Sequence, residues 1–110
     1  MKNINLKIYQ MKHDETTRGK KFWDIDEYVK YVDLNDYYLM FEMMIEKDIT
    51  LDDIYCMFND TEIKDYKGHS LSVSDIIVLD GEAYYVQGMG FKKVNLCGVA
   101  EDRIALGFPR

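Results

Sequence analysis

Hydrophobic and polar residues alternate at the start of the chain. Within residues 3–11, the apolar residues Ile4, Leu6 and Ile8 alternate with polar neighbours. This period of two predicts a β-strand with one buried face. Residues 13–21 are polar, contain a glycine and show no period, which indicates a loop.

Two segments have a helical period. The first begins at Asp24, a candidate N-cap with Glu27 three residues later. Its apolar face comprises Ile25, Tyr28, Val29 and Val32. The second begins at Thr50, with Asp53 at the capping-box position. Its apolar face comprises Leu51, Ile54, Tyr55 and Phe58. Two short helices are therefore expected.

Residues 37–45 are almost wholly apolar and follow a turn signal at Asn35-Asp36. Their tyrosine and phenylalanine content favours a strand, whereas their methionines leave a helix as the alternative. A continuous apolar strand is buried on both faces. Its methionines either fill the core or form an adaptable binding face, and we favour the core.

The C-terminal half predicts a series of antiparallel strands. Residues 74–79 are rich in β-branched residues, and Asp80-Gly81 is typical of a two-residue type I′ hairpin leading into a partner strand over residues 83–87. Glycines at 88 and 90 predict a turn or bulge before a strand over residues 91–96.

These patterns predict an α+β fold, with a mainly antiparallel sheet of four or five strands and two short helices. The 110 residues fit a single domain, 1–110, with a weakly patterned tail over residues 97–110 that we expect to be partly ordered. Cys56 and Cys97 do not imply a disulfide framework. No segment has the length of a membrane span or the pattern of a signal peptide, which favours a cytoplasmic protein.

The net charge of −6 is unevenly distributed. Residues 1–23 contain six Lys or Arg and two acidic residues, whereas residues 24–65 contain thirteen acidic residues and three lysines. Residues 66–110 contain five of each sign. An acidic surface repels phosphate, so we expect no direct binding to nucleic acid and favour a protein partner with a basic surface.

The carboxylates cluster at the two expected helix starts. Stabilisation by the helix dipole explains some of them, and solubility alone is the competing interpretation. The tyrosines nearby are candidate anchors for a partner. The candidate partner-binding residues are Asp24, Asp26, Glu27, Tyr28, Tyr31, Asp48, Asp52, Asp53 and Tyr55.

Catalytic chemistry has little support. His69 precedes Ser70, Ser72, Ser74 and Asp75. Neighbours on an extended segment point to alternate faces, so these residues cannot form a triad by themselves, and turn or cap roles are simpler. Two histidines and two distant cysteines give no metal-binding spacing, and no glycine loop precedes a helix in the way that phosphate binding requires. We expect no enzyme activity, cofactor or metal.

Residues 68–79 (GHSLSVSDIIVL), with Tyr84-Tyr85-Val86 and Gly90-Phe91, resemble the YodL-like family. Weaker matches at residues 8–11 and 50–59 extend the resemblance upstream, giving a YodL-like core over residues 1–96. The resemblance implies no established enzyme chemistry. It suggests that the motif is structural, with Ser72, Ser74 and Asp75 satisfying backbone groups near a strand start.

The resemblance also implies a setting of mobile elements in Gram-positive gut bacteria. We therefore expect a non-enzymatic inhibitor from a mobile element or prophage, acting in the host cytoplasm on a basic surface of a defence nuclease. The most specific form is an anti-CRISPR protein against a type II effector with its guide RNA. The alternative is an interaction module acting on a cytoskeletal or cell-shape protein through the Met-rich strand. The oligomeric state stays open.

Overall fold

In the computed structural model, residues 3–13, 17, 25, 29–60, 66 and 70–102 are described. Within them lie seven strands, one α-helix and one 3-10 turn. The elements are β1 (Asn3–Met11), β2 (Tyr31–Asp33), η1 (Leu34–Asp36), β3 (Tyr37–Glu46), α1 (Leu51–Asp60), β4 (Ile76–Leu79), β5 (Glu82–Gln87), β6 (Gly90–Cys97) and β7 (Glu101–Asp102).

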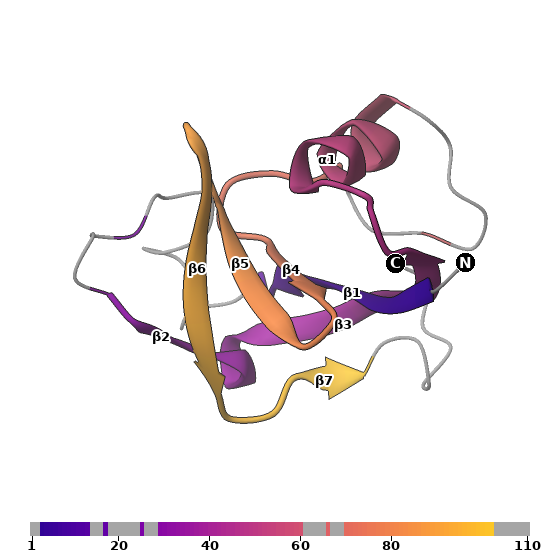
Figure 1. The fold of residues 1–110 in the computed structure, drawn as a ribbon. Coiled ribbons are helices and arrows are strands. Elements are labelled where there is room, and N and C mark those ends of the chain that lie inside the picture. Colours follow the sequence, from indigo (N-terminus) through magenta and orange to yellow (C-terminus); the bar gives the residue numbers. More distant parts are fainter. Residues whose placement is uncertain are drawn as a thin grey trace.

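The strands form one mixed sheet in the order β2-β6-β5-β4-β1-β3-β7. The sheet curls into a half-barrel, with α1 on one side of it (Figure 1). The pairs β2–β6 and β3–β7 are parallel, and the other pairs are antiparallel. The expected sheet of four or five mainly antiparallel strands with two helices is therefore wrong. Strands of three and two residues at the two edges are too short to produce a period in the sequence.

The first expected helix is wrong in its described part. Val32, expected on its apolar face, lies in β2 and is aligned with Leu96 of β6. The amide of Asn95 donates to the carbonyl of Lys30 at 2.8 Å, so the chain is already extended before β2 begins. Pairing with a distant strand has overridden the local helical period.

The predicted strand over residues 3–11 is confirmed as β1, and it lies in the middle of the sheet with β3 and β4 on either side. Leu6 and Ile8 pack in a core beneath α1, whereas Tyr9 and Met11 pack in a second core on the other face. The register with β3 shifts between Ile8 and Tyr9. The strand is thus buried on both faces near its end, and not only on the expected one.

The predicted strand over residues 37–45 is confirmed as β3, and the hairpin at Asp80-Gly81 is confirmed as well. Asp80 has a φ of 52° and Gly81 a φ of 82°, and a type I′ turn requires positive φ at both positions. A second two-residue turn joins β5 to β6, with Gln87 aligned with Gly90. Local turn chemistry therefore fixes the β4–β5–β6 part of the sheet.

The helix predicted from Thr50 is confirmed as α1. The Thr50 amide donates to Oδ2 of Asp53 at 3.2 Å, and the Asp53 amide donates to Oγ1 of Thr50 at 3.1 Å, so the capping box is reciprocal. Ile54 and Phe58 are buried against the sheet. The ring of Phe41 on β3 meets that of Phe58 edge to face, with the centroids 5.6 Å apart.

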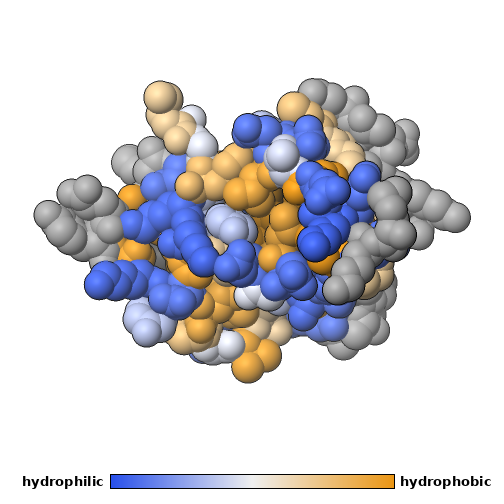
Figure 2. Space-filling view, viewed as in Figure 1, coloured by the Kyte–Doolittle hydropathy of each residue, from blue (hydrophilic) through white to orange (hydrophobic). Residues whose placement is uncertain are grey.

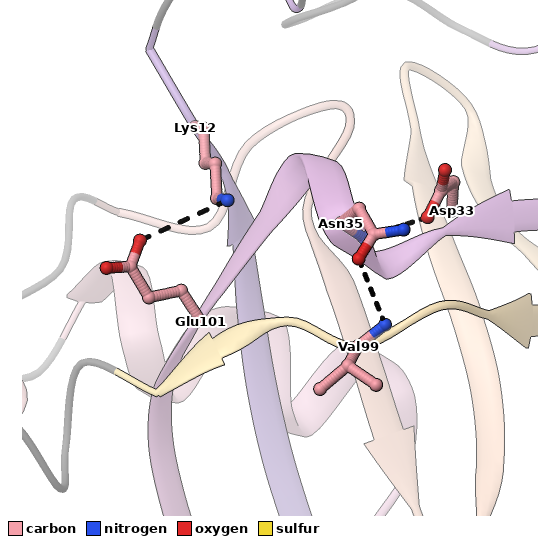
Figure 3. A network of polar contacts seen from close by, with 5 residues as sticks. All are labelled: Lys12, Asp33, Asn35, Val99 and Glu101. Atoms are coloured by element: carbon pink, nitrogen blue, oxygen red, sulfur yellow. Dashed lines mark hydrogen bonds and ion pairs between the residues drawn. The ribbon is translucent and has the colours of Figure 1, made fainter.

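A polar seam holds β7 beside the rest of the sheet (Figure 3). Asp33 accepts a hydrogen bond from the Asn35 amide at 2.9 Å, and the Asn35 side chain accepts one from the Val99 amide at 3.4 Å. Lys12 lies 4.0 Å from the Glu101 carboxylate. The described part of the tail ends with β7, and residues 103–110 lie outside the described residues.

Candidate protein-binding surface

The acidic segment, residues 42–53, joins the second half of β3 to the start of α1. It contains five carboxylates and one lysine. These charged residues are Glu42, Glu46, Lys47, Asp48, Asp52 and Asp53, and all of them are exposed. The structure therefore presents this part of the acidic middle of the chain to solvent.

Helix chemistry explains only part of this acidity. Asp53 belongs to the capping box, and Asp52 lies in the first turn, where the helix dipole favours a carboxylate. Asp48 precedes the cap, and Glu42 and Glu46 lie on β3. These three carboxylates have no role in starting the helix.

Two acidic residues elsewhere in the described part, Glu82 and Glu101, have basic partners. Lys93 lies 2.8 Å from Glu82, and their hydrogen bond lowers the pKa of Glu82 and raises the pKa of Lys93. Glu101 has Lys12 beside it. Within the described residues, no carboxylate of the acidic segment forms such an ion pair. The carboxylates of the segment thus differ from Glu82 and Glu101 in having no ion-pair partner among the described residues.

Tyr55 is the candidate anchor that lies next to the acidic segment. Its side chain is 37% exposed, and its ring meets that of Phe91 on β6 edge to face, with the centroids 6.2 Å apart. Figure 2 shows hydrophobic atoms in the middle of this face, between α1 and the β5–β6 hairpin, with hydrophilic side chains around them. An apolar anchor beside a charged rim is common in protein interfaces.

The structure does not bring all nine candidate residues together. Asp48, Asp52, Asp53 and Tyr55 lie at α1, whereas Tyr31, 65% exposed, lies on β2 at the opposite edge of the sheet (Figure 1). The remaining candidates lie outside the described residues. They are Asp24, Asp26, Glu27 and Tyr28.

Most of the apolar side chains of β3 belong to the core. Tyr37 and Met40 are buried, and Phe41 and Met43 are half-buried. Met44, 56% exposed, is the exception. The core interpretation of this strand is confirmed, so a broad methionine binding face is not present on β3.

The serine and aspartate motif holds the start of β4. Oδ2 of Asp75 accepts hydrogen bonds from the Ser72 amide at 2.9 Å and from Nε2 of Gln10 at 3.1 Å. The Tyr37 hydroxyl donates to the carbonyl of Ser74 at 2.7 Å, and burial raises the pKa of Tyr37. The structural role expected for Asp75 and Ser72 is confirmed, since the Ser72 hydroxyl also donates to the carbonyl of Ser70 at 3.0 Å. His69 lies outside the described residues.

The described residues contain no group of three or more His, Cys, Asp or Glu side chains that could hold a metal ion. Cys56 and Cys97 are both free and exposed. Among the described residues, no helix has both the length and the apolar character needed to cross a membrane.

A feature that sequence reasoning missed is the backbone of β3. The strand β7 lies beside only Tyr38 and Leu39, so β3 has no strand on its outer side from Phe41 to Glu46 within the described part. An unpaired strand backbone cannot be recognised from the residue types of the strand. The one signal in this sequence is the pair of glutamates at 42 and 46, because charged side chains are common on open edges.

The fold and this surface define a small half-barrel domain with an exposed acidic segment and, within the described residues, an unpaired sheet edge. The model of the YodL-like domain matches residues 5–96. The chain therefore belongs to the YodL-like domain family. No curated protein and no solved structure matches the chain.

Proposed function

We propose that this protein is a non-enzymatic inhibitor from a mobile element or prophage that binds a basic surface of a host defence nuclease. The specific candidate target is a type II RNA-guided effector nuclease, which would make the protein an anti-CRISPR protein. The observation that carries the proposal is the exposed acidic segment, whose carboxylates have no ion-pair partner among the described residues.

The sign of the charge selects the kind of partner. Five carboxylates and one lysine in twelve residues give a potential that repels nucleic-acid phosphate and attracts lysine-rich and arginine-rich surfaces. An effector of this type holds its guide–target duplex in a positively charged channel. A carboxylate surface placed in that channel would compete with the nucleic-acid backbone.

The charge exceeds what the fold uses. Asp53 is needed to cap α1, so it is a poor site for testing partner binding. Asp48 and Asp52 are exposed and make no hydrogen bond with another described side chain. Their carboxylates and that of Glu46 are available to a basic partner. Oε2 of Glu42 accepts a hydrogen bond from Nδ2 of Asn5 at 2.9 Å, which leaves its other oxygen for a partner.

The test is binding of the full chain to a purified type II effector–guide complex at low and high salt. We expect Asp48→Lys/Asp52→Lys to weaken binding by about tenfold or more, since two close charge contacts contribute at least 1.4 kcal/mol together. The wild-type affinity should fall steeply with salt.

The control is Glu82→Lys/Glu101→Lys, which changes the net charge equally at sites away from α1. Because it also removes the ion pairs with Lys93 and Lys12, circular dichroism first checks that it is folded. It should bind nearly as well as the wild type. Failure of the wild type to bind the effector, or equal weakening by the two charge reversals, would contradict the proposal.

A further inference from the structure

Among the described residues, no strand lies on the outer edge of β3 along its second half. Within the described residues, β7 is aligned with β3 only at Tyr38 and Leu39. From Phe41 to Glu46, the neighbour of β3 in the sheet is β1 on the inner side alone. The exposed edge of a strand is a template for another strand.

The direction of the backbone groups follows from one hydrogen bond. The Asp80 amide donates to the carbonyl of Asn5 at 2.9 Å, so the backbone groups of Asn5 face β4. Successive residues of a strand face opposite sides, so those of Leu6 face β3, where its aligned residue is Met43. The backbone groups of Glu42 and Met44 therefore point away from β1, to the open side.

The side chains of the same residues are exposed. Glu42, Met44 and Glu46 project to the solvent face, whereas Phe41, Met43 and Ile45 pack towards the core beneath α1. The edge thus presents the backbone groups of Glu42 and Met44 beside a row of three side chains, two acidic and one apolar. The carbonyl of Glu46 is already used, since it accepts a hydrogen bond from the Ile49 amide at 3.2 Å.

We propose that an extended basic segment of a partner protein adds to β3 as a further strand at residues 41–46. This inference rests on the proposed function and specifies how the acidic segment would hold its partner. Charge complementarity selects the occupant, because lysines on alternate positions of the added strand would lie beside Glu42 and Glu46.

A second copy of the chain is a poor occupant. Self-pairing would place another Glu42 and Glu46 against the first pair, and like charges across a strand pair are destabilising. Acidic side chains on the edge therefore oppose self-association while permitting a basic strand.

The probe is an acetylated peptide, Lys-Thr-Lys-Val-Lys-Thr-Lys, titrated into the full chain. We expect amide exchange at Glu42 and Met44 to slow by about tenfold or more in the complex, because each amide gains a strand hydrogen bond. A peptide with glutamate in place of lysine should give no protection.

Two N-methylated peptides separate strand pairing from charge attraction. One has methyl groups on lysine amides and the other has the same number on the threonine and valine amides. When the lysines of the added strand lie beside the glutamates, either the lysine amides or the threonine and valine amides point towards β3, depending on the direction of the strand. One peptide therefore keeps all the amides that pair with β3, and the other loses them. Their affinities should differ by about tenfold or more. Equal affinities would overturn the proposal.

Two single proline substitutions in β3 test whether the peptide pairs with its outer edge. Met44→Pro should fold, because proline is tolerated where the amide faces the open side, and it should lose the peptide protection at Glu42. Met43→Pro should unfold, because that amide faces β1. Slow exchange at Glu42 and Met44 before the peptide is added would show an edge already occupied, and would also overturn the proposal.

The two proposals can fail separately. If Asp48→Lys/Asp52→Lys loses the effector but Met44→Pro and the methylated peptides have no effect, the acidic inhibitor stands and strand addition is wrong. If the peptide protects Glu42 and Met44 but no effector binds, strand addition stands and the nuclease target is wrong.

Discussion

The two halves of β3 are parts of one strand with one inner neighbour, β1, yet their surroundings differ. In the first half, Tyr38 and Leu39 have β7 beside them, and the hydroxyl of the buried Tyr37 donates a hydrogen bond to the carbonyl of Ser74. Phe41 to Glu46 has no described strand on its outer side and exposes alternate side chains. The first half is paired on both sides, and the second half has an unpaired outer edge within the described residues. A continuous apolar run in the sequence therefore does not show which part of a strand is paired on both sides.

The largest expected difference between the two halves comes from removing one side chain in each. Tyr37 is fully buried, so Tyr37→Ala should lower the free energy of unfolding by about 3–5 kcal/mol. Met44→Ala, at an exposed site, should change it by no more than about 0.5 kcal/mol. Urea unfolding measures both. Similar losses would mean that the two halves contribute alike to the fold.

The seam that holds β7 depends on Gly98. Its φ is +71°, and a Cβ would lie against Asp33 and within 2.8 Å of Nδ2 of Asn35. Gly98→Ala should cost about 1–3 kcal/mol for the backbone conformation, with a further loss from that contact.

Gly81→Ala is the matched control for the seam. Gly81 also has a positive φ, +82°, but a Cβ there meets nothing within 4 Å. The difference between the two melting temperatures measures the contacts with Asp33 and Asn35. A larger loss at Gly81 would contradict the role of the seam in closing the first half of β3.

The first half of β3 should also respond to alkaline pH. Burial, with Tyr85, Asp75 and Asp36 nearby, raises the pKa of Tyr37 above its usual 10.0. The unfolded chain then releases this proton at a lower pH than the folded chain does. The stabilising effect is complete below pH 10 and is lost as the pH rises above that value.

Comparison with Tyr37→Phe measures this effect. The wild type should lose stability with pH more steeply than the variant, by about 1.4 kcal/mol per pH unit above the usual tyrosine pKa. Tyr9, Tyr66 and Tyr84, whose pKa values burial also raises, remain in both proteins. Parallel pH profiles would show that Tyr37 ionises equally in both states.

The smallest expected effect concerns α1, the helix that follows the second half of β3. Thr50→Ala removes the cap of α1 and should lower stability by about 1 kcal/mol. Cys56→Ala, at an exposed position of the same helix, is the control. Circular dichroism during unfolding measures both, and equal stability of the two variants would argue against the capping box as a determinant of α1.

The elements that were predicted correctly depend on local chemistry. The capping box at Thr50, the Asp80-Gly81 turn and the alternation over residues 3–11 each act between near neighbours. The elements that were missed depend on distant partners, since β2 is defined by Asn95–Cys97 and β7 by Tyr38 and Leu39. Neither pairing leaves a periodic signal in a segment of two or three residues.

The same distinction applies to the candidate surface. The carboxylates at Asp48, Asp52 and Asp53 are visible in the sequence, and their exposure at the start of α1 could be predicted from the capping signal. Tyr31 could not be placed, because its expected helix is replaced in the described part by a strand at the far edge. The open edge of β3 could not be predicted either, because it depends on where β7 ends.

The central place of β1 has a consequence for synthesis on the ribosome. Both of its neighbours, β3 and β4, come later in the chain, and β4 ends at Leu79. At translation rates of roughly 5–20 residues per second, several seconds pass between the synthesis of β1 and the synthesis of both strands that pair with it. During that time a nascent strand with apolar residues is open to chaperones or to wrong pairing. The hairpins of β4, β5 and β6 can form as soon as they emerge, and they can then supply the surface on which β1 is finally enclosed.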